Sequence, residues 1–160
     1  MMSNAEAIQV FWDSFISATN KDASVNIVDC YHFDITEEWA NKLLGLVLAG
    51  TKKATSSSIY SYECEKTALP KKGDFNIVTD WDGNPQCVIE TTNVTILPFR
   101  DITFEICKRE GEDDSLESWQ KGHIHFFTED GQTEGYQFTW DMPVVFEDFE
   151  VVYRNNQSNI

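Results

Sequence analysis

The stretch Gly50-Thr51-Lys52-Lys53-Ala54-Thr55-Ser56-Ser57 marks the point where the sequence changes from helical to strand-like patterning. Before it, Trp39, Leu43 and Val47 recur at helical spacing, with Asp34 or Thr36 available as an N-cap. Glycine is a common residue just past the end of a helix. The pattern therefore predicts an apolar helix over 36–49 that ends at Gly50.

Beyond Gly50 the sequence is rich in β-branched residues interrupted by turn signals. It predicts strands over 54–62, 75–79 and 86–97, with turns at 69–74 and 82–85. Residues 101–108 are expected to form a short helix or turn. Two later segments, 135–139 and 144–153, are expected to be strands.

A second informative stretch is Glu110-Gly111-Glu112-Asp113-Asp114-Ser115-Leu116, which holds four carboxylates. Asp114 followed three residues later by Glu117 resembles a capping box, and it predicts a helix over 114–127. An amphipathic helix is also predicted near the N-terminus, over about 4–18. This order of elements favours an α+β fold in which a mostly antiparallel, mixed sheet curls into a small barrel flanked by helices.

At 160 residues the chain is expected to form a single domain over residues 1–154, followed by a flexible tail over 155–160. Its longest apolar run, 43–49, is far shorter than the roughly 20 residues needed to cross a membrane. The first residues do not resemble a signal peptide, so we expect a cytoplasmic protein without a membrane partner. The four cysteines lack metal-ligand spacing, and no metal or cofactor is expected.

The chain has 12 Lys and Arg residues against 27 Asp and Glu residues, a net charge of −15. Proteins that grip a nucleic-acid backbone gain affinity largely by neutralising phosphates. The acidic surface should therefore repel a long polynucleotide, and no DNA partner is expected. A nucleoside-sized ligand would be little affected, and a short basic patch could still contact single-stranded RNA. No oligomeric state follows from the sequence.

Taken in order, several motifs resemble the ASCH domain family, a PUA-like β-barrel family linked to RNA, and in particular its longer bacterial subgroup. The resemblance covers about residues 8–153. Its motifs are Phe11-Trp12, Gly50 to Ser57, Leu69-Pro70 with Gly73-Asp74, Pro85 to Thr92, Glu110 to Trp119, and His123 to Phe127. This resemblance implies a PUA-like fold.

Some small bacterial members of that family are amidohydrolases that remove acetyl from N4-acetylcytidine with a Lys, a Thr and a Glu. The resemblance places these roles on Lys52, Thr55 and Glu110, and this chain differs from those enzymes at Lys53 and Ser57. Lys52 could polarise a carbonyl or act as a base, while Glu110 would be the acid or base. A threonine hydroxyl needs a neighbouring base, either Lys52 or Glu110, to become a nucleophile.

Other residues receive simpler interpretations. We expect Glu112 to Asp114 to solvate and cap the later helix, and His123 to pack on its apolar face. We expect Lys52 and Glu110 to be exposed enough that their loss leaves stability nearly unchanged. Stacking on a base or hydrogen bonding to its edge could involve further side chains, and the candidate substrate-binding residues are Lys53, Ser56, Ser57, Tyr60 and Trp81.

Three functions are compatible with these residues. The first is a small amidohydrolase acting on an N-acylated nucleoside such as N4-acetylcytidine. The second is a non-catalytic RNA- or nucleotide-binding module, and the third is a ribonuclease. The net charge favours the first, because binding a polymer calls for phosphate neutralisation.

Overall fold

The computed structural model describes residues 1–22 and 24–154, so the predicted tail over 155–160 lies outside the described residues. The elements follow the order α1 Asn4–Thr19, β1 Ile27–Tyr31, α2 Glu37–Leu48, β2 Ala54–Ser58, α3 Ile59–Glu65, β3 Phe75–Thr79, β4 Pro85–Pro98, η1 Phe99–Asp101, α4 Phe104–Cys107, η2 Lys108–Glu110, α5 Leu116–Glu134 and β5 Pro143–Arg154. The two η elements are single 3₁₀ turns.

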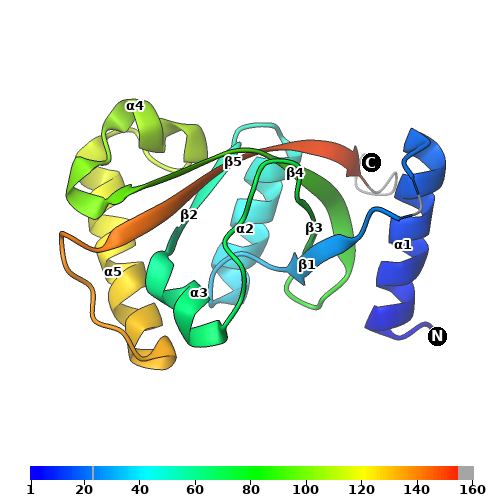
Figure 1. Cartoon of the computed structure of the whole chain (residues 1–160), viewed down its shortest axis with the longest axis horizontal. Coiled ribbons are helices and arrows are strands. Elements are labelled where there is room, and N and C mark those ends of the chain that lie inside the picture. The colour runs from blue at the N-terminus through cyan, green and yellow to red at the C-terminus, as the bar shows by residue number, and fades with distance from the viewer. Residues whose placement is uncertain (23, 155–160) are drawn as a thin grey trace.

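All five strands belong to one sheet, in the order β1-β3-β4-β5-β2. Three neighbouring pairs are antiparallel, and only β1 and β3 are parallel. The long strands β4 and β5 run along the long axis of the molecule (Figure 1). Their pairing shifts register twice, between Val88 and Ile89 and between Thr91 and Asn93. Such irregularities bend a strand and increase its twist. The predicted α+β class and mixed, mostly antiparallel sheet are confirmed.

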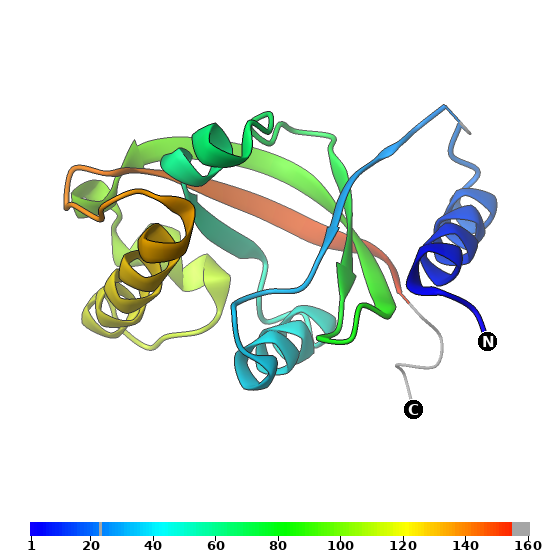
Figure 2. The same cartoon turned by 90° about the horizontal axis from the view of Figure 1, so that it is seen from below.

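The helices cover different parts of this sheet. In Figures 1 and 2, α1 lies at one end of the long axis, while α4 and α5 lie at the other. The aromatic face of α1 packs against β3 and β4 and forms one hydrophobic cluster with them. Helix α2 belongs to a second hydrophobic cluster, which includes Val78, Ile89 and Phe149. The third cluster joins α5 to the start of β5. None of the helices in residues 1–22 and 24–154 has both the length and the apolar character that spanning a bilayer requires.

The predicted helix over 36–49 is confirmed as α2, and Thr36 is its cap, because its hydroxyl accepts from the Trp39 amide. The predicted helix over 4–18 is confirmed as α1. It opens with a capping box in which Ser3 and Glu6 exchange hydrogen bonds. In both helices an apolar face at 3.6-residue spacing is buried against the sheet, which explains why periodicity located them.

Three predicted elements are wrong in part. The strand expected over 54–62 ends at Ser58, whose hydroxyl accepts from the Tyr60 amide and starts α3. The later helix is capped by Ser115 rather than Asp114 and continues to Glu134. The segment 135–139 is therefore a connection between α5 and β5 rather than a strand. Strand β1 was not predicted at all.

Candidate functional site

The loop after α2 determines which of two adjacent lysines points inward. Gly50 adopts φ +78°, and the amides of Thr51 and Lys52 both donate to the Leu46 carbonyl at the end of α2. Lys53 then pairs with two other segments, since its amide donates to Arg109 and its carbonyl accepts from Phe149. As a result Lys52 is 2% exposed, whereas Lys53 lies on the surface.

The ammonium of Lys52 is held by three oxygen acceptors. It donates to the Ala54 carbonyl at 2.7 Å, to Glu112 Oε2 at 2.6 Å and to Glu110 Oε1 at 3.4 Å. It also lies 5.3 Å from the centre of the Phe33 ring. An ammonium has three protons to donate, so this set of acceptors matches its capacity.

Glu110 is the acidic centre of the same cluster and is 1% exposed. Its Oε2 accepts from Trp119 Nε1 at 2.5 Å and from Ser56 Oγ at 3.2 Å. Burial alone would raise the pKa of Glu110, but His123, Lys52 and the hydrogen bonds from His123 and Trp119 outweigh it and lower the pKa to about 2. Glu110 is therefore a carboxylate at neutral pH.

His123 belongs to this cluster as well as to the packing of α5. Its ring stacks on Trp119, with centroids 4.1 Å apart, as the predicted packing role requires. Nδ1 lies 2.9 Å from the Trp119 carbonyl, and Nε2 lies 3.4 Å from Glu110 Oε2. Both ring nitrogens thus face acceptors, which suits the imidazolium. Burial lowers the pKa of His123, yet the charge of Glu110 and its hydrogen bond raise it above the ordinary value.

Glu112 is the more exposed of the two carboxylates in the cluster. Its side chain is 16% exposed, against 2% for Glu110, 1% for Lys52 and 13% for His123. Burial raises its pKa above the ordinary value, although Lys52 opposes the shift. The expectation that Glu112 only solvates the helix is therefore wrong. Lys52, His123, Glu110 and Glu112 form the charge cluster, which is neutral when all four are ionised.

Strand β2 divides its side chains between two faces of the sheet. Ser56 meets Glu110, and Ser58 meets Met142, so these two share the face of the charge cluster. Alternation along a strand then places Thr55 and Ser57 on the other face. There Thr55 is paired in register with Glu147, whose carboxylate accepts from Thr91 Oγ1 at 2.5 Å.

The structure thus brings together Lys52, Glu110 and Ser56 from the predicted set, and separates Thr55 and Ser57 from them. Tyr60 packs with Tyr136 at the α5 end of the molecule. Trp81 lies in the β3–β4 turn against His32. Neither aromatic ring contacts the charge cluster.

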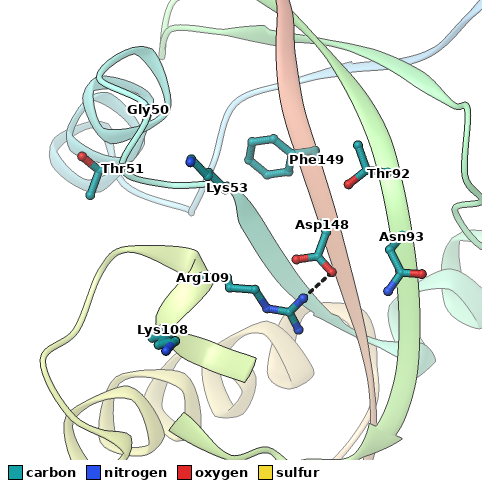
Figure 3. Close-up of a pocket in the computed structure, with 9 residues that line it drawn as sticks. All are labelled: Gly50, Thr51, Lys53, Thr92, Asn93, Lys108, Arg109, Asp148 and Phe149. Atoms are coloured by element: carbon teal, nitrogen blue, oxygen red, sulfur yellow. Dashed lines mark hydrogen bonds and ion pairs between the residues drawn. The ribbon is translucent and has the colours of Figure 1, made fainter. Parts of the chain in front are cut away.

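Two adjoining hollows lie beside the loop that follows α2, and Lys52 is the member of the charge cluster that lines one of them. The larger, of about 690 Å³, is drawn in Figure 3 and is lined by Gly50, Thr51, Lys53, Thr92, Asn93, Lys108, Arg109, Asp148 and Phe149. The smaller, of about 340 Å³, includes Lys52 in its wall and shares Gly50, Lys53, Thr92 and Phe149 with the larger. Among the described residues, no group of three or more His, Cys, Asp or Glu side chains is arranged to hold a metal ion.

Sequence reasoning missed Glu112, His123 and Arg109. His123 follows Trp119 by four residues, and that helical spacing could have placed both beside Glu110. Glu112 was hidden in an acidic run that is more often solvated. Arg109 directly follows Lys108 and precedes Glu110, but two adjacent cations gave no signal of the hollow that they line.

Comparison with known proteins places these features in a family. The model of the ASCH domain matches residues 29–153. The crystal structure of a protein from Enterococcus faecalis V583, described by the family model DUF984, is 32% identical with a TM-score of 0.88, over 97% of this chain and 93% of that one. An ASCH domain from Lactobacillus crispatus JV V101 is also 32% identical, with a TM-score of 0.84 over 93% and 96%. No curated protein matches this chain.

Proposed function

Because this chain belongs to the ASCH domain family and has its PUA-like fold, we propose that it hydrolyses the amide of an N-acylated nucleoside such as N4-acetylcytidine. The observation that carries the proposal is the 2.6 Å pair between Lys52 and Glu112, the more exposed of the two carboxylates in the charge cluster. A fixed cation beside a carboxyl of raised pKa is a suitable arrangement for amide hydrolysis.

In this proposal Glu112 is the general base and then the general acid. A water molecule attacks the carbonyl carbon, and Glu112 takes its proton. The negative charge that develops on the carbonyl oxygen is stabilised by the ammonium of Lys52. The C–N bond then breaks as Glu112 returns the proton to the leaving amine, which yields a carboxylic acid and the free amino nucleoside.

The buried members of the cluster are positioning residues. Glu110 holds the Lys52 ammonium on one side and His123 on the other, and its pKa of about 2 makes it a poor proton carrier at neutral pH. Thr55 lies on the other face of β2, so the attack is assigned to water rather than to its hydroxyl.

A non-catalytic RNA- or nucleotide-binding module is the second candidate. The observation in its favour is that the three protons of the Lys52 ammonium already have protein acceptors. A lysine so held can serve purely to join the two loops. ASCH domains are linked to RNA, and in this second reading the two hollows would bind a nucleotide without reacting with it.

The deciding experiment measures release of cytidine from N4-acetylcytidine by the wild type, Glu112→Gln and Glu117→Gln. Glu117 is an exposed acid in the first turn of α5 and is the matched control. We expect Glu112→Gln to lose about 10²–10⁴ of the rate and Glu117→Gln to keep it. Equal rates in both variants would remove the role of Glu112. A wild type that releases no cytidine but binds the nucleoside would establish the binding module instead.

A further inference from the structure

The larger hollow gathers cations in a protein that has few of them. Lys53, Lys108 and Arg109 line it, and Asp148 is the acid among its lining residues. The wall therefore carries a local excess of positive charge, although the whole chain has a net charge of −15. A concave surface lined by one sign of charge raises the local concentration of ligands of the opposite sign.

Arg109 is fixed in place before any ligand arrives. Its Nε donates to the Ile106 carbonyl at 3.2 Å, and its Nη1 donates to Asp148 Oδ2 at 2.9 Å, as Figure 3 shows for the second contact. Its guanidinium carbon also lies 5.1 Å from the centre of the Phe146 ring. These contacts leave Nη2 without an acceptor among the described residues, and 40% of the side chain is exposed.

The two lysines are available at the mouth of the hollow. Lys53 lies on the surface and makes no ion pair with the described residues. Lys108 pairs with Glu105 at 2.8 Å, but both side chains are about half or more exposed, and such pairs contribute little. Thr92 and Asn93 on β4 add neutral hydrogen-bonding groups to the opposite wall (Figure 3).

We propose that this hollow binds the phosphate monoester of a nucleotide, and that the substrate class is an N-acylated nucleoside monophosphate. The inference rests on the proposed function, and it adds which substituent the substrate carries. Arginine with a fixed, planar fork is suited to a phosphate group, and the two lysines add point charges to it.

The connection between the two hollows supports one ligand that occupies both. They share Gly50, Lys53, Thr92 and Phe149, so a group in the larger is directly beside a group in the smaller. The smaller has apolar side chains from α2 and β5, which suit a base or an acyl group, and its lining also includes Lys52 and Glu150. A single phosphate fits the local patch, whereas the acidic surface elsewhere would repel a longer polymer.

Binding measurements test this inference without any turnover. Titration calorimetry compares cytidine with cytidine 5′-monophosphate for the wild type, Lys53→Ala, Lys108→Ala and Lys121→Ala. Lys121 is an exposed lysine of α5 outside both hollows, so it controls for the change in net charge. We expect the monophosphate to bind about tenfold tighter than cytidine in the wild type, which is about 1.4 kcal/mol.

That affinity ratio should fall severalfold in Lys53→Ala and in Lys108→Ala, and stay at its wild-type value in Lys121→Ala. Equal affinity for cytidine and its monophosphate, no binding of either, or equal effects of all three variants would overturn the inference. So would tighter binding of a single-stranded oligonucleotide without terminal phosphates, because the hollow would then recognise a phosphodiester. A monophosphate that binds through Lys53 while no acylated cytidine is hydrolysed would support the phosphate site and refute the hydrolase.

Discussion

Gly111 lies against the carbonyl of Thr51, so closely that a Cβ on Gly111 would overlap the carbonyl oxygen. This contact presses the loop that carries Glu110 and Glu112 onto the loop that carries Lys52. Two residues from each of these, the Lys53 amide donates to the Arg109 carbonyl at 3.0 Å, and this hydrogen bond joins the same two loops. The charge cluster and the larger hollow both depend on this approach.

Gly111→Ala should therefore damage stability and the site together. The residue has φ +70°, which costs an L-residue about 1–2 kcal/mol, and the methyl group would also force the two loops apart. Gly135 has φ +96° with open space around it, so Gly135→Ala carries the backbone cost alone. Urea unfolding should show a clearly larger loss for Gly111→Ala. Equal losses would mean that the Gly111–Thr51 contact is not tight.

Lys52→Met should destabilise the protein strongly. Removing one partner of a buried ion pair leaves the other charge uncompensated, which costs about 3–5 kcal/mol. The sequence-based expectation that Lys52 and Glu110 could be lost with little effect on stability assumed exposure, and both side chains are buried. Lys53→Met, on the surface, should change the free energy of unfolding by less than about 0.5 kcal/mol. Similar midpoints for the two variants in urea would contradict the burial of Lys52.

Stability should fall as the pH rises from 6 to 8, and His123 should cause part of that fall. Its pKa is raised in the folded protein, so its stabilisation is complete below the unfolded value of about 6.5 and is lost as the pH passes the higher folded value. Glu112, whose pKa is also raised, acts in the same direction at lower pH.

The measurement is the free energy of unfolding at several pH values for the wild type, His123→Gln and His125→Gln. His125 lies on the same helix with its side chain 75% exposed, so its variant should keep the wild-type slope. The slope should be shallower in His123→Gln. An unchanged slope in that variant would show that His123 does not titrate in this range.

The carboxylate on the other face of the sheet offers a separate test. Glu147 is 7% exposed and accepts from Thr91, which is fully buried. Thr91→Val removes the donor and leaves a buried acid unpaired, at a cost of about 1–3 kcal/mol. Thr91→Ser keeps the hydroxyl and should cost less in thermal or urea unfolding. A smaller loss of stability in Thr91→Val than in Thr91→Ser would show that the hydrogen bond contributes nothing to stability.

The sequence predicted the elements with a strong apolar or β-branched pattern. The periodic apolar faces of α1 and α2 located these helices, and the β-branched runs located β3, which is buried at every position, together with β4 and β5. Strand β1 was missed because Asp29 interrupts a run of only five residues, and its strand conformation depends on pairing with β3, a segment about 50 positions away. The end of β2 at Ser58 was missed because one local hydrogen bond outweighs a strand-like composition.

For the candidate site, the family resemblance placed Lys52 and Glu110 correctly beside each other. It could not show that the strand turns Ser56 rather than Thr55 toward Glu110, since this depends on where the strand starts. Nor could it show which of the neighbouring carboxylates reaches solvent. That property follows from the packing of Gly111 on Thr51, which composition does not reveal.

The charge cluster also bears on the order in which the chain folds. Its two central contacts join residues 58 and 60 positions apart, so they can form only after much of the sheet has brought the loops together. Interactions completed after the transition state slow unfolding without speeding folding. We expect loss of Lys52 or Glu110 to leave the folding rate nearly unchanged and to raise the unfolding rate. The charge cluster would then slow unfolding of the native protein, and its main effect would be on the lifetime of the native state.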